Sequence, residues 1–247
     1  MNPMSRMRWT TSMVLLFAAL LAAADKKDKS KPPDAEHIDS GSFGVFVKGQ
    51  RVLTETFRIE TDAGISQVKS QLQESGGSAS VQKSELKMSG SGELISYTWS
   101  DSNSSLVVTP NNEFLLEKIT TASSSKPAEQ PFLMPSTSAI LDNNFFVHRE
   151  VLAWRYLGTA CHTEGGNLQC KPSDEYGVLV PQDRTSMRVR VELVGKEKLT
   201  IRGAERELLR LNLKGDAFSW TLWVDDKDKF KLVRVLIPDD NTEVLRD

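Results

Sequence analysis

Short runs rich in β-branched and aromatic residues, each ended by Gly, Asn, Asp, Ser or Pro, recur along the chain from Ser42 onward. Because the links between runs are short, neighbouring strands are expected to pair antiparallel as a meander. The chain has no GxGxxG, P-loop or heptad pattern, which speaks against an α/β nucleotide-binding fold. The predicted strands form a first set, 42–48, 51–61, 65–73, 79–88, 93–100, 105–109 and 113–120, and a second set, 176–180, 187–194, 198–202, 207–214, 217–224 and 230–237.

The segment GVFVKGQRVLTETFRIE, residues 44–60, is typical of one long β-hairpin and carries apolar side chains on both faces. With Gly49-Gln50 in a type II′ turn, Lys48 would pair with Arg51. One face would then hold Phe43, Val45, Val47, Val52, Thr54 and Thr56, and the other Phe46, Leu53, Glu55, Phe57 and Ile59. A sheet with one wet side would show polar residues on one set. The pattern therefore predicts a sheet whose second face meets a helix or a ligand, with Glu55 as the acidic residue to test for burial.

One substantial helix is predicted between the two sets of strands, at about 142–157. Asp142, Asn143 or Asn144 could each cap its start, and Gly158 lies just past its predicted end. The segment is apolar on most sides, so we expect it to pack on the concave side of a curved sheet. Together these patterns predict a mainly β fold, a curved antiparallel meander that forms an incomplete β-barrel around one helix.

The N-terminus has the layout of a secretory signal peptide, residues 1–24. Arg6 and Arg8 precede an apolar run from Met13 to Ala24, which is shorter than the roughly 20 residues of a bilayer-spanning helix. Cleavage before Asp25 is expected, with an uncleaved anchor as the alternative. Residues 25–41 have the composition of a flexible charged leader, and 42–247 are expected to form a single β-rich domain. We therefore expect a secreted or periplasmic protein with no transmembrane segment after cleavage.

The charge composition speaks against a nucleic-acid-binding protein. The chain has 31 Lys and Arg against 33 Asp and Glu, and the signal peptide removes two of the basic residues, which leaves a mildly acidic protein.

The chain has two cysteines, Cys161 and Cys170, which flank HTEGGNLQ. In an oxidising compartment two thiols this close in sequence are expected to form a disulfide. The alternative is a metal site that also uses His162 and Glu164, but the spacing matches no zinc motif. The sequence therefore predicts no metal and no cofactor.

Catalytic patterns are weak. His37, His148 and His162 stand in no HExxH or related spacing, no GxSxG elbow is present, and DDKDK at 225–229 does not match a calcium loop. The sequence favours binding over catalysis and leaves an enzyme open. A buried Glu55 or a His148 facing a polar cavity would be the signs of one.

Aromatic side chains could line a cavity for an apolar ligand, although core packing also explains each of them. The candidate ligand-binding residues are Phe43, Phe57, Trp99, Phe146, Trp154, Trp220 and Trp223.

The opening hairpin VFVKGQRVLTETFRIE, the long meander, the mid-chain apolar helix and the closing hairpin WTLWVDDKDKFKLVRVLIP together resemble uncharacterised bacterial envelope proteins whose fold is similar to the Lol-type lipoprotein carriers. The resemblance implies a curved antiparallel sheet around an apolar cavity, with helices at its open side. The leading hypothesis is a non-catalytic protein that binds or carries a lipid or acyl chain in a half-barrel. The alternative is an envelope structural or assembly factor that binds a partner protein through a strand edge or hairpin surface.

Overall fold

The computed structural model describes residues 35–76, 81–124, 126–165 and 167–247. The predicted signal peptide and residues 25–34 of the predicted leader lie outside the described residues. For residues 36–41 the prediction of a flexible leader was wrong, because strand β1 (Glu36–Val47) already begins there. This polar segment is ordered by pairing with β2 (Gln50–Asp62) and by a buried ion pair between Asp39 and Arg246.

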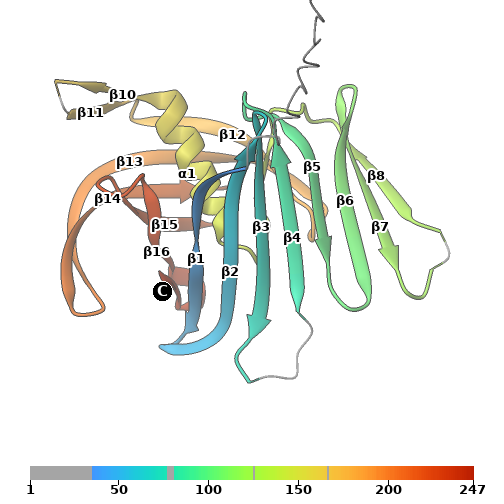
Figure 1. Cartoon of the computed structure of the whole chain (residues 1–247), viewed down its shortest axis with the longest axis horizontal. Helices are drawn as coiled ribbons and strands as arrows, with labels where there is room; N and C mark the ends of the chain where they lie inside the picture. Colours follow the sequence, from blue (N-terminus) through green and yellow to red (C-terminus); the bar gives the residue numbers. More distant parts are fainter. Residues whose placement is uncertain (1–34, 77–80, 125, 166) are drawn as a thin grey trace, which may run out of the picture. The chain divides into compact units, whose positions relative to one another are not determined.

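One sheet of 15 strands dominates the described chain (Figure 1). Its first meander continues from β1 and β2 through β3 (Ile65–Glu74), β4 (Gln82–Met88), β5 (Leu94–Ser100), β6 (Ser104–Asn111), β7 (Phe114–Thr121) and β8 (Ala128–Phe132). Its second meander consists of β12 (Ser173–Val180), β13 (Thr185–Ile201), β14 (Ala204–Lys214), β15 (Ser219–Asp225), β16 (Lys231–Ile237), a short 3₁₀ turn at Pro238–Asp240 and β17 (Thr242–Arg246).

The first and last strands join the two meanders, because β1 pairs antiparallel with β17. At the far end of the second meander, the short strand β9 (Ala139–Ile140) pairs in parallel with β12. The two outermost strands are β8 and β9, so the sheet remains open and does not close into a barrel. The predicted mainly β, incomplete-barrel architecture is confirmed. The alternative of a partner protein bound at a strand edge stays a prediction.

Several strand predictions were wrong in detail. The GKEK segment was predicted to separate strands 187–194 and 198–202, but β13 runs through it with a bulge between Leu193 and Gly195. Gly195 accommodates the bulge with a φ of 138°, which a residue with a side chain adopts only under strain. Strands β8, β9 and β17 were not predicted.

The opening hairpin turns one residue earlier than predicted, at Lys48-Gly49. Both residues have positive φ, 51° and 80°, as a type I′ turn requires. With the bulge after Val45, this register places Phe43 and Val45 on the same inner face as Glu55, Phe57 and Ile59. The predicted doubling of apolar faces was therefore wrong for this hairpin: its buried apolar residues gather on one face, whereas Val52 is exposed. The predicted register, one residue away from the actual one, had divided the buried residues between two faces.

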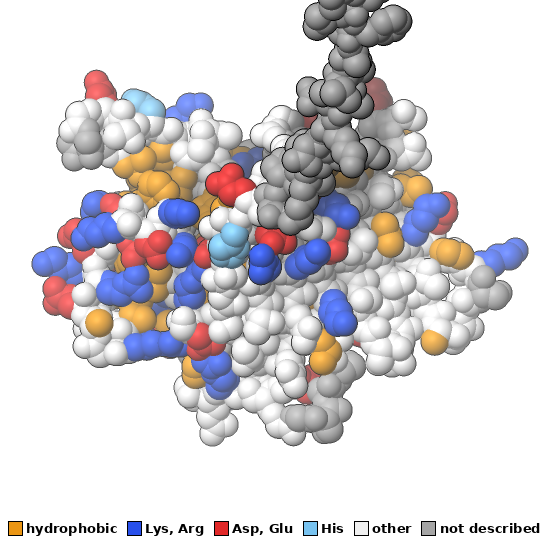
Figure 2. Space-filling view, in the orientation of Figure 1, with side chains coloured by type: hydrophobic (Ala, Val, Ile, Leu, Met, Phe, Trp, Pro, Cys, Tyr) orange, Lys and Arg blue, Asp and Glu red, His pale blue; other side chains and the backbone are white. Residues whose placement is uncertain are grey.

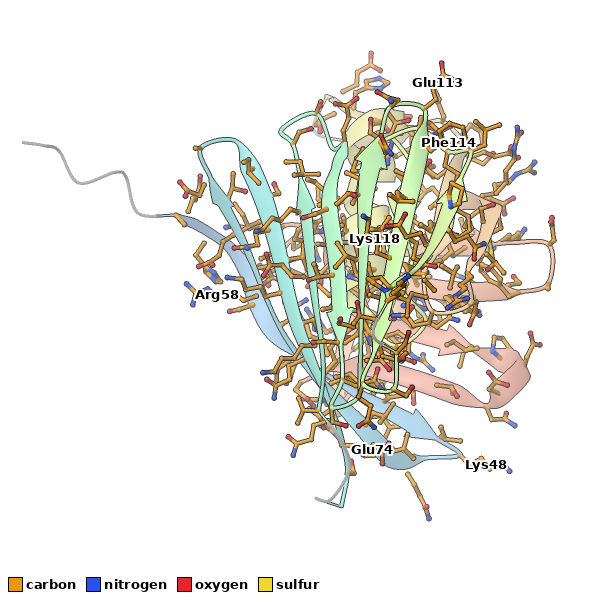
Figure 3. The ribbon with its side chains drawn as sticks, turned by 90° about the vertical axis from the view of Figure 1, so that its right-hand side faces the viewer. Lys48, Arg58, Glu74, Glu113, Phe114 and Lys118 are labelled. Atoms are coloured by element: carbon orange, nitrogen blue, oxygen red, sulfur yellow. A yellow bond between two sulfur atoms is a disulfide. The ribbon has the colours of Figure 1, made fainter. Side chains whose placement is uncertain are left out.

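Figure 3 looks onto the first meander from the side. Lys48 and Glu74 lie at one end of it, and Glu113 and Phe114, in the turn from β6 to β7, lie at the other (Figure 3). Because a meander alternates its turns between its two ends, the β4–β5 turn around Ser91 belongs to the Glu113 end. On the surface, acidic and basic side chains are interspersed, without a large area of one sign on the face in view (Figure 2).

The helix α1 spans Val147–Ala160, not the predicted 142–157. Asp142 does not cap it, because its carboxylate is engaged by Tyr97 and Gln182, and Gly158 lies inside its last turn. Its strand neighbours are β10, β12 and β16. The helix lies against the second meander, within the curve of the sheet, as predicted (Figure 1).

The predicted disulfide between Cys161 and Cys170 is confirmed. It joins β10 (Cys161–Glu164) to β11 (Asn167–Cys170) at the end of α1. Both sulfurs are used by this bond, which excludes the alternative metal site in the oxidised protein.

Removing the bridge tests its contribution. The double variant Cys161→Ser/Cys170→Ser is expected to lose roughly 2–3 kcal/mol of unfolding free energy, because the reduced unfolded chain gains loop entropy. Thermal denaturation should show a midpoint lower by about 5–10 °C, while Thr163→Ser in the same hairpin leaves it unchanged. Two free thiols per chain in denatured, unreduced protein would contradict the bridge.

Candidate functional site

A cavity of about 450 Å³ lies between α1 and the inner face of the first meander. Strands β1 to β5 and β9 contribute to its wall opposite the helix. Its deepest lining is aliphatic and almost completely buried, and consists of Ile59, Val68, Leu86, Leu94, Ile140 and Leu152. The volume falls in the range of about 300–1,000 Å³ that is typical of small-molecule sites.

The two sides of α1 have different roles. Residues 149, 150, 153, 156, 157 and 160 are buried and lie on one side, and the contacts of Arg149, Glu150 and Tyr156 reach the second half of the chain. Residues 148, 151, 152, 154, 155, 158 and 159 recur at spacings of three and four, so they share the other side and line the cavity. The helix is therefore packed on one side and faces the cavity with the other.

The cavity runs along the helix from a buried end to an exposed rim. His148 at the buried end is 1% exposed, whereas Gly158 and Thr159 are exposed. At 1.5 Å per residue, His148 and Arg155 are roughly 10 Å apart along the helix axis. The rim also includes Gly90 and Ser91, in the β4–β5 turn at the Glu113 end of the meander.

His148 is a neutral hydrogen-bond donor at the buried end. Its Nδ1 accepts the backbone N–H of Asp142 at 3.3 Å, which assigns the proton to Nε2. Within the described part of the chain, Nε2 has no hydrogen-bond partner. Burial, assisted by neighbouring Arg149, lowers the pKa of His148 to about 3, so the ring is neutral at physiological pH.

Glu55 is completely buried and caps the start of α1 from strand β2. Its carboxylate accepts the N–H of Phe146 at 2.6 Å, the N–H of Val147 at 3.3 Å and the hydroxyl of Ser70 at 2.6 Å. Burial raises the pKa of Glu55 to about 7, against the opposing effect of these hydrogen bonds and of Arg149. Glu55 does not line the cavity, and both of its oxygens are occupied by the cap.

Arg149 holds the loop before the helix. Its guanidinium donates to the carbonyls of Asp142 and Phe145 and lies 4.8 Å from the centroids of both the Phe146 and Trp220 rings. Burial lowers the pKa of Arg149 to about 10.

Glu150 ties the helix to the second meander. Its carboxylate accepts the N–H of Leu232 and a guanidinium N–H of Arg246, both at 3.1 Å. Arg246 also pairs with buried Asp39, and burial raises the pKa of Glu150 to about 8. The charged residues Arg149 and Glu150 therefore attach the packed side of the helix to the rest of the fold. Their neighbour His148 lines the cavity.

Of the seven predicted ligand-binding residues, the structure places Trp154 in the cavity wall, where its Nε1 also donates to the Phe230 carbonyl at 2.8 Å. The other six do not line this cavity. Phe43 and Phe57 stack at 5.0 Å beside Arg246, Phe146 and Trp220 flank Arg149, Trp99 donates to Gln82, and Trp223 packs in a separate cluster with Ile201, Leu208 and Val233.

The sequence did not identify the aliphatic residues that line the cavity as a candidate site. They alternate along their strands, but this alternation is the same in a packed core and in a cavity wall.

No family model and no curated protein matches the chain. A solved structure from Brucella abortus, described as a β-barrel-like protein of domain of unknown function DUF1849, aligns with 86% of this chain and 95% of its own, at 6% sequence identity and a TM-score of 0.49. The likeness to the Lol-type carriers stays a prediction.

Replacing the cap tests whether Glu55 fixes the helix. Glu55→Leu leaves the N–H groups of Phe146 and Val147 without an acceptor, whereas the Ser70 hydroxyl keeps the Thr56 carbonyl at 3.2 Å. We therefore expect a loss of about 2–3 kcal/mol in unfolding free energy. Urea denaturation measures it, with Glu74→Leu, at an exposed position on β3, as the matched control. Equal stability of the two variants would show that the cap contributes nothing.

Glu117 on β7 is buried, and neither of its carboxylate oxygens has a hydrogen-bond partner among the described residues. The nearest cation is Arg184, whose Nε lies 3.9 Å away. Burial raises the pKa of Glu117 from 4.5 to about 7. Between these two values the folded protein holds a proton that the unfolded chain releases, so Glu117 reduces stability as the pH rises through this window.

Glu117→Gln should therefore raise the unfolding free energy at pH 8 by about 1 kcal/mol, since it removes a buried charge whose oxygens accept no hydrogen bond from the described residues. The gain should vanish near pH 4.5, where the wild-type carboxyl is protonated. Denaturation at both pH values measures the difference, and Glu129→Gln on exposed β8 is the control. A gain of the same size at both pH values would contradict the assignment.

Proposed function

We propose that this protein binds and carries an apolar small molecule, a lipid or an acyl chain, in the cavity beside α1. The observation that carries the proposal is the buried aliphatic lining of a cavity of about 450 Å³. Each Å² of apolar ligand surface removed from water contributes about 25 cal/mol. Part of this is offset by the cost of association, which is smaller for a preformed site.

The cavity is open at its rim, but its inner wall is made of buried aliphatic side chains, whereas a packed core leaves few voids larger than a water molecule. Here the helix is held at its start by Glu55 and on the side away from the cavity by Arg149 and Glu150. Val151 and Leu152 face the cavity but do not fill it. The arrangement favours a ligand site over a packing defect.

The proposed role is binding without chemistry. Glu55 has a pKa of about 7, but its oxygens are committed to the helix cap. His148 lines the cavity but has a pKa of about 3, so it does not exchange protons near neutral pH. These properties suit a neutral hydrogen-bond donor beside a ligand better than an acid–base catalyst.

We further propose that the protein works outside the cytoplasm, in the periplasm or as a secreted protein. The disulfide supports this location, because such bonds persist in oxidising compartments. No helix among the described residues has the length and apolar character needed to cross a membrane.

Leu152→Trp tests the cavity as the binding site. The larger side chain should occupy the space, so we expect binding of phenylnaphthylamine, a neutral dye that fluoresces in apolar sites, to weaken at least about tenfold, a change of about 1.4 kcal/mol. Val194→Trp, at an exposed position on β13, should bind like the wild type.

Circular dichroism would establish that both variants are folded, and native mass spectrometry after gentle purification would show whether the wild type retains lipid. Wild-type protein that neither retains lipid nor binds the dye would refute the proposed function. If folded Leu152→Trp bound the dye as strongly as the wild type, the dye would bind at a site other than this cavity.

A further inference from the structure

We infer that the ligand of this cavity is a single-chain amphiphile with an acidic headgroup, which Arg155 receives at the rim. The inference rests on the proposed function and adds to it the class and orientation of the ligand. It starts from the position of Arg155, the cationic residue among those that line the cavity.

Arg155 differs from the other arginines that lie against aromatic rings, because each of those has protein acceptors for its guanidinium. Arg149 donates to the carbonyls of Asp142 and Phe145. Arg51, Arg234 and Arg246 each combine a ring with a carboxylate within 4.0 Å, supplied by Asp247, Glu243 and both Asp39 and Glu150, respectively. The Arg155 guanidinium lies 5.2 Å from the centroid of the Tyr176 ring. Among the described residues, no carboxylate lies within 4.0 Å of it.

Two acidic side chains near the rim accept hydrogen bonds from neighbouring groups and not from Arg155. Asp174 accepts hydrogen bonds from the Tyr176 hydroxyl at 3.3 Å and from the Glu175 N–H at 3.0 Å. Glu93 accepts a hydrogen bond from the Ser91 hydroxyl at 3.4 Å. Arg155 thus presents a half-buried guanidinium that no carboxylate of the described residues approaches within 4.0 Å.

A guanidinium matches an acidic headgroup geometrically. Its planar set of N–H donors can bind a carboxylate or a phosphate through two parallel hydrogen bonds. Ser91 and Thr159 also lie at this rim, but their hydroxyl groups donate to the Glu93 carboxylate at 3.4 Å and to the Arg155 carbonyl at 2.8 Å. The group that the rim offers to an anionic end of a ligand is therefore the Arg155 guanidinium.

The polarity of the cavity sets the ligand's orientation. At the buried end the wall is aliphatic and His148 is neutral, so an anion placed there would be desolvated without a compensating charge. At the rim the same anion would meet Arg155 and remain partly hydrated. The acidic group therefore lies at Arg155, and the apolar chain runs inward along the helix for roughly 10 Å.

Displacement of phenylnaphthylamine by three ligands of equal chain length tests this inference: dodecanoic acid and dodecyl phosphate below their micelle concentrations, and dodecanol below its solubility limit. Wild-type protein should prefer one or both acidic ligands over dodecanol by about fivefold, the size of a favourable ion pair near the surface. The preference should shrink in high salt. Arg155→Gln should abolish it without changing dodecanol binding, and Arg155→Lys should retain part of it.

Arg188→Gln is the matched control, since Arg188 is an exposed arginine on β13 that does not line the cavity. Equal binding of all three ligands to the wild type would overturn the acidic headgroup and leave the proposed function standing. An equal loss of acid and alcohol binding in Arg155→Gln would also overturn it, because the residue would then act through the fold. Failure of every ligand and of the dye would refute the proposed function, and the inference with it.

Discussion

The hydrogen bonds between the Glu55 carboxylate and the first N–H groups of α1 determine where the helix lies. A helix that starts inside a protein leaves its first N–H groups without intrahelical partners, and water is not available there to replace them. A carboxylate from the neighbouring sheet supplies the acceptor and also matches the positive end of the helix dipole. The price is a buried carboxyl group, whose desolvation raises the pKa of Glu55 to about 7.

This cap also explains why a cavity persists beside the helix. Directional polar contacts hold α1 at its start through Glu55 and along its packed side through Glu150. Apolar packing has no such direction, so on its own it would favour movement of the helix toward the first meander until the space closed. With the helix fixed, the side chains at 151 and 152 leave space between the helix and strands β2 to β5. The cavity is therefore a consequence of how the helix is attached.

Much of the architecture could be predicted from local patterns. Alternation and turn residues indicated most strands and their antiparallel pairing. The apolar segment between the two sets of strands indicated the helix, and the two nearby cysteines indicated the disulfide. The register of the opening hairpin could not be predicted reliably, because Gly49 suits the first position of a type II′ turn and the second of a type I′ turn equally well. The start of the helix was also misplaced: Asp142 resembles a cap, whereas the actual acceptor, Glu55, is 91 residues from Phe146 in the sequence.

The candidate site shows a different limit of sequence reasoning, since the aromatic residues chosen for the ligand mostly serve the arginines of the fold. Phe146 and Trp220 flank Arg149, and Phe43 and Phe57 flank Arg246. An arginine can be buried when rings and hydrogen-bond acceptors together replace its water. Arg155 has its ring in Tyr176 but no carboxylate within 4.0 Å among the described residues. The residue that best distinguishes the cavity from an ordinary core is therefore a charged one, and it could be recognised only after the partners of the other arginines were known.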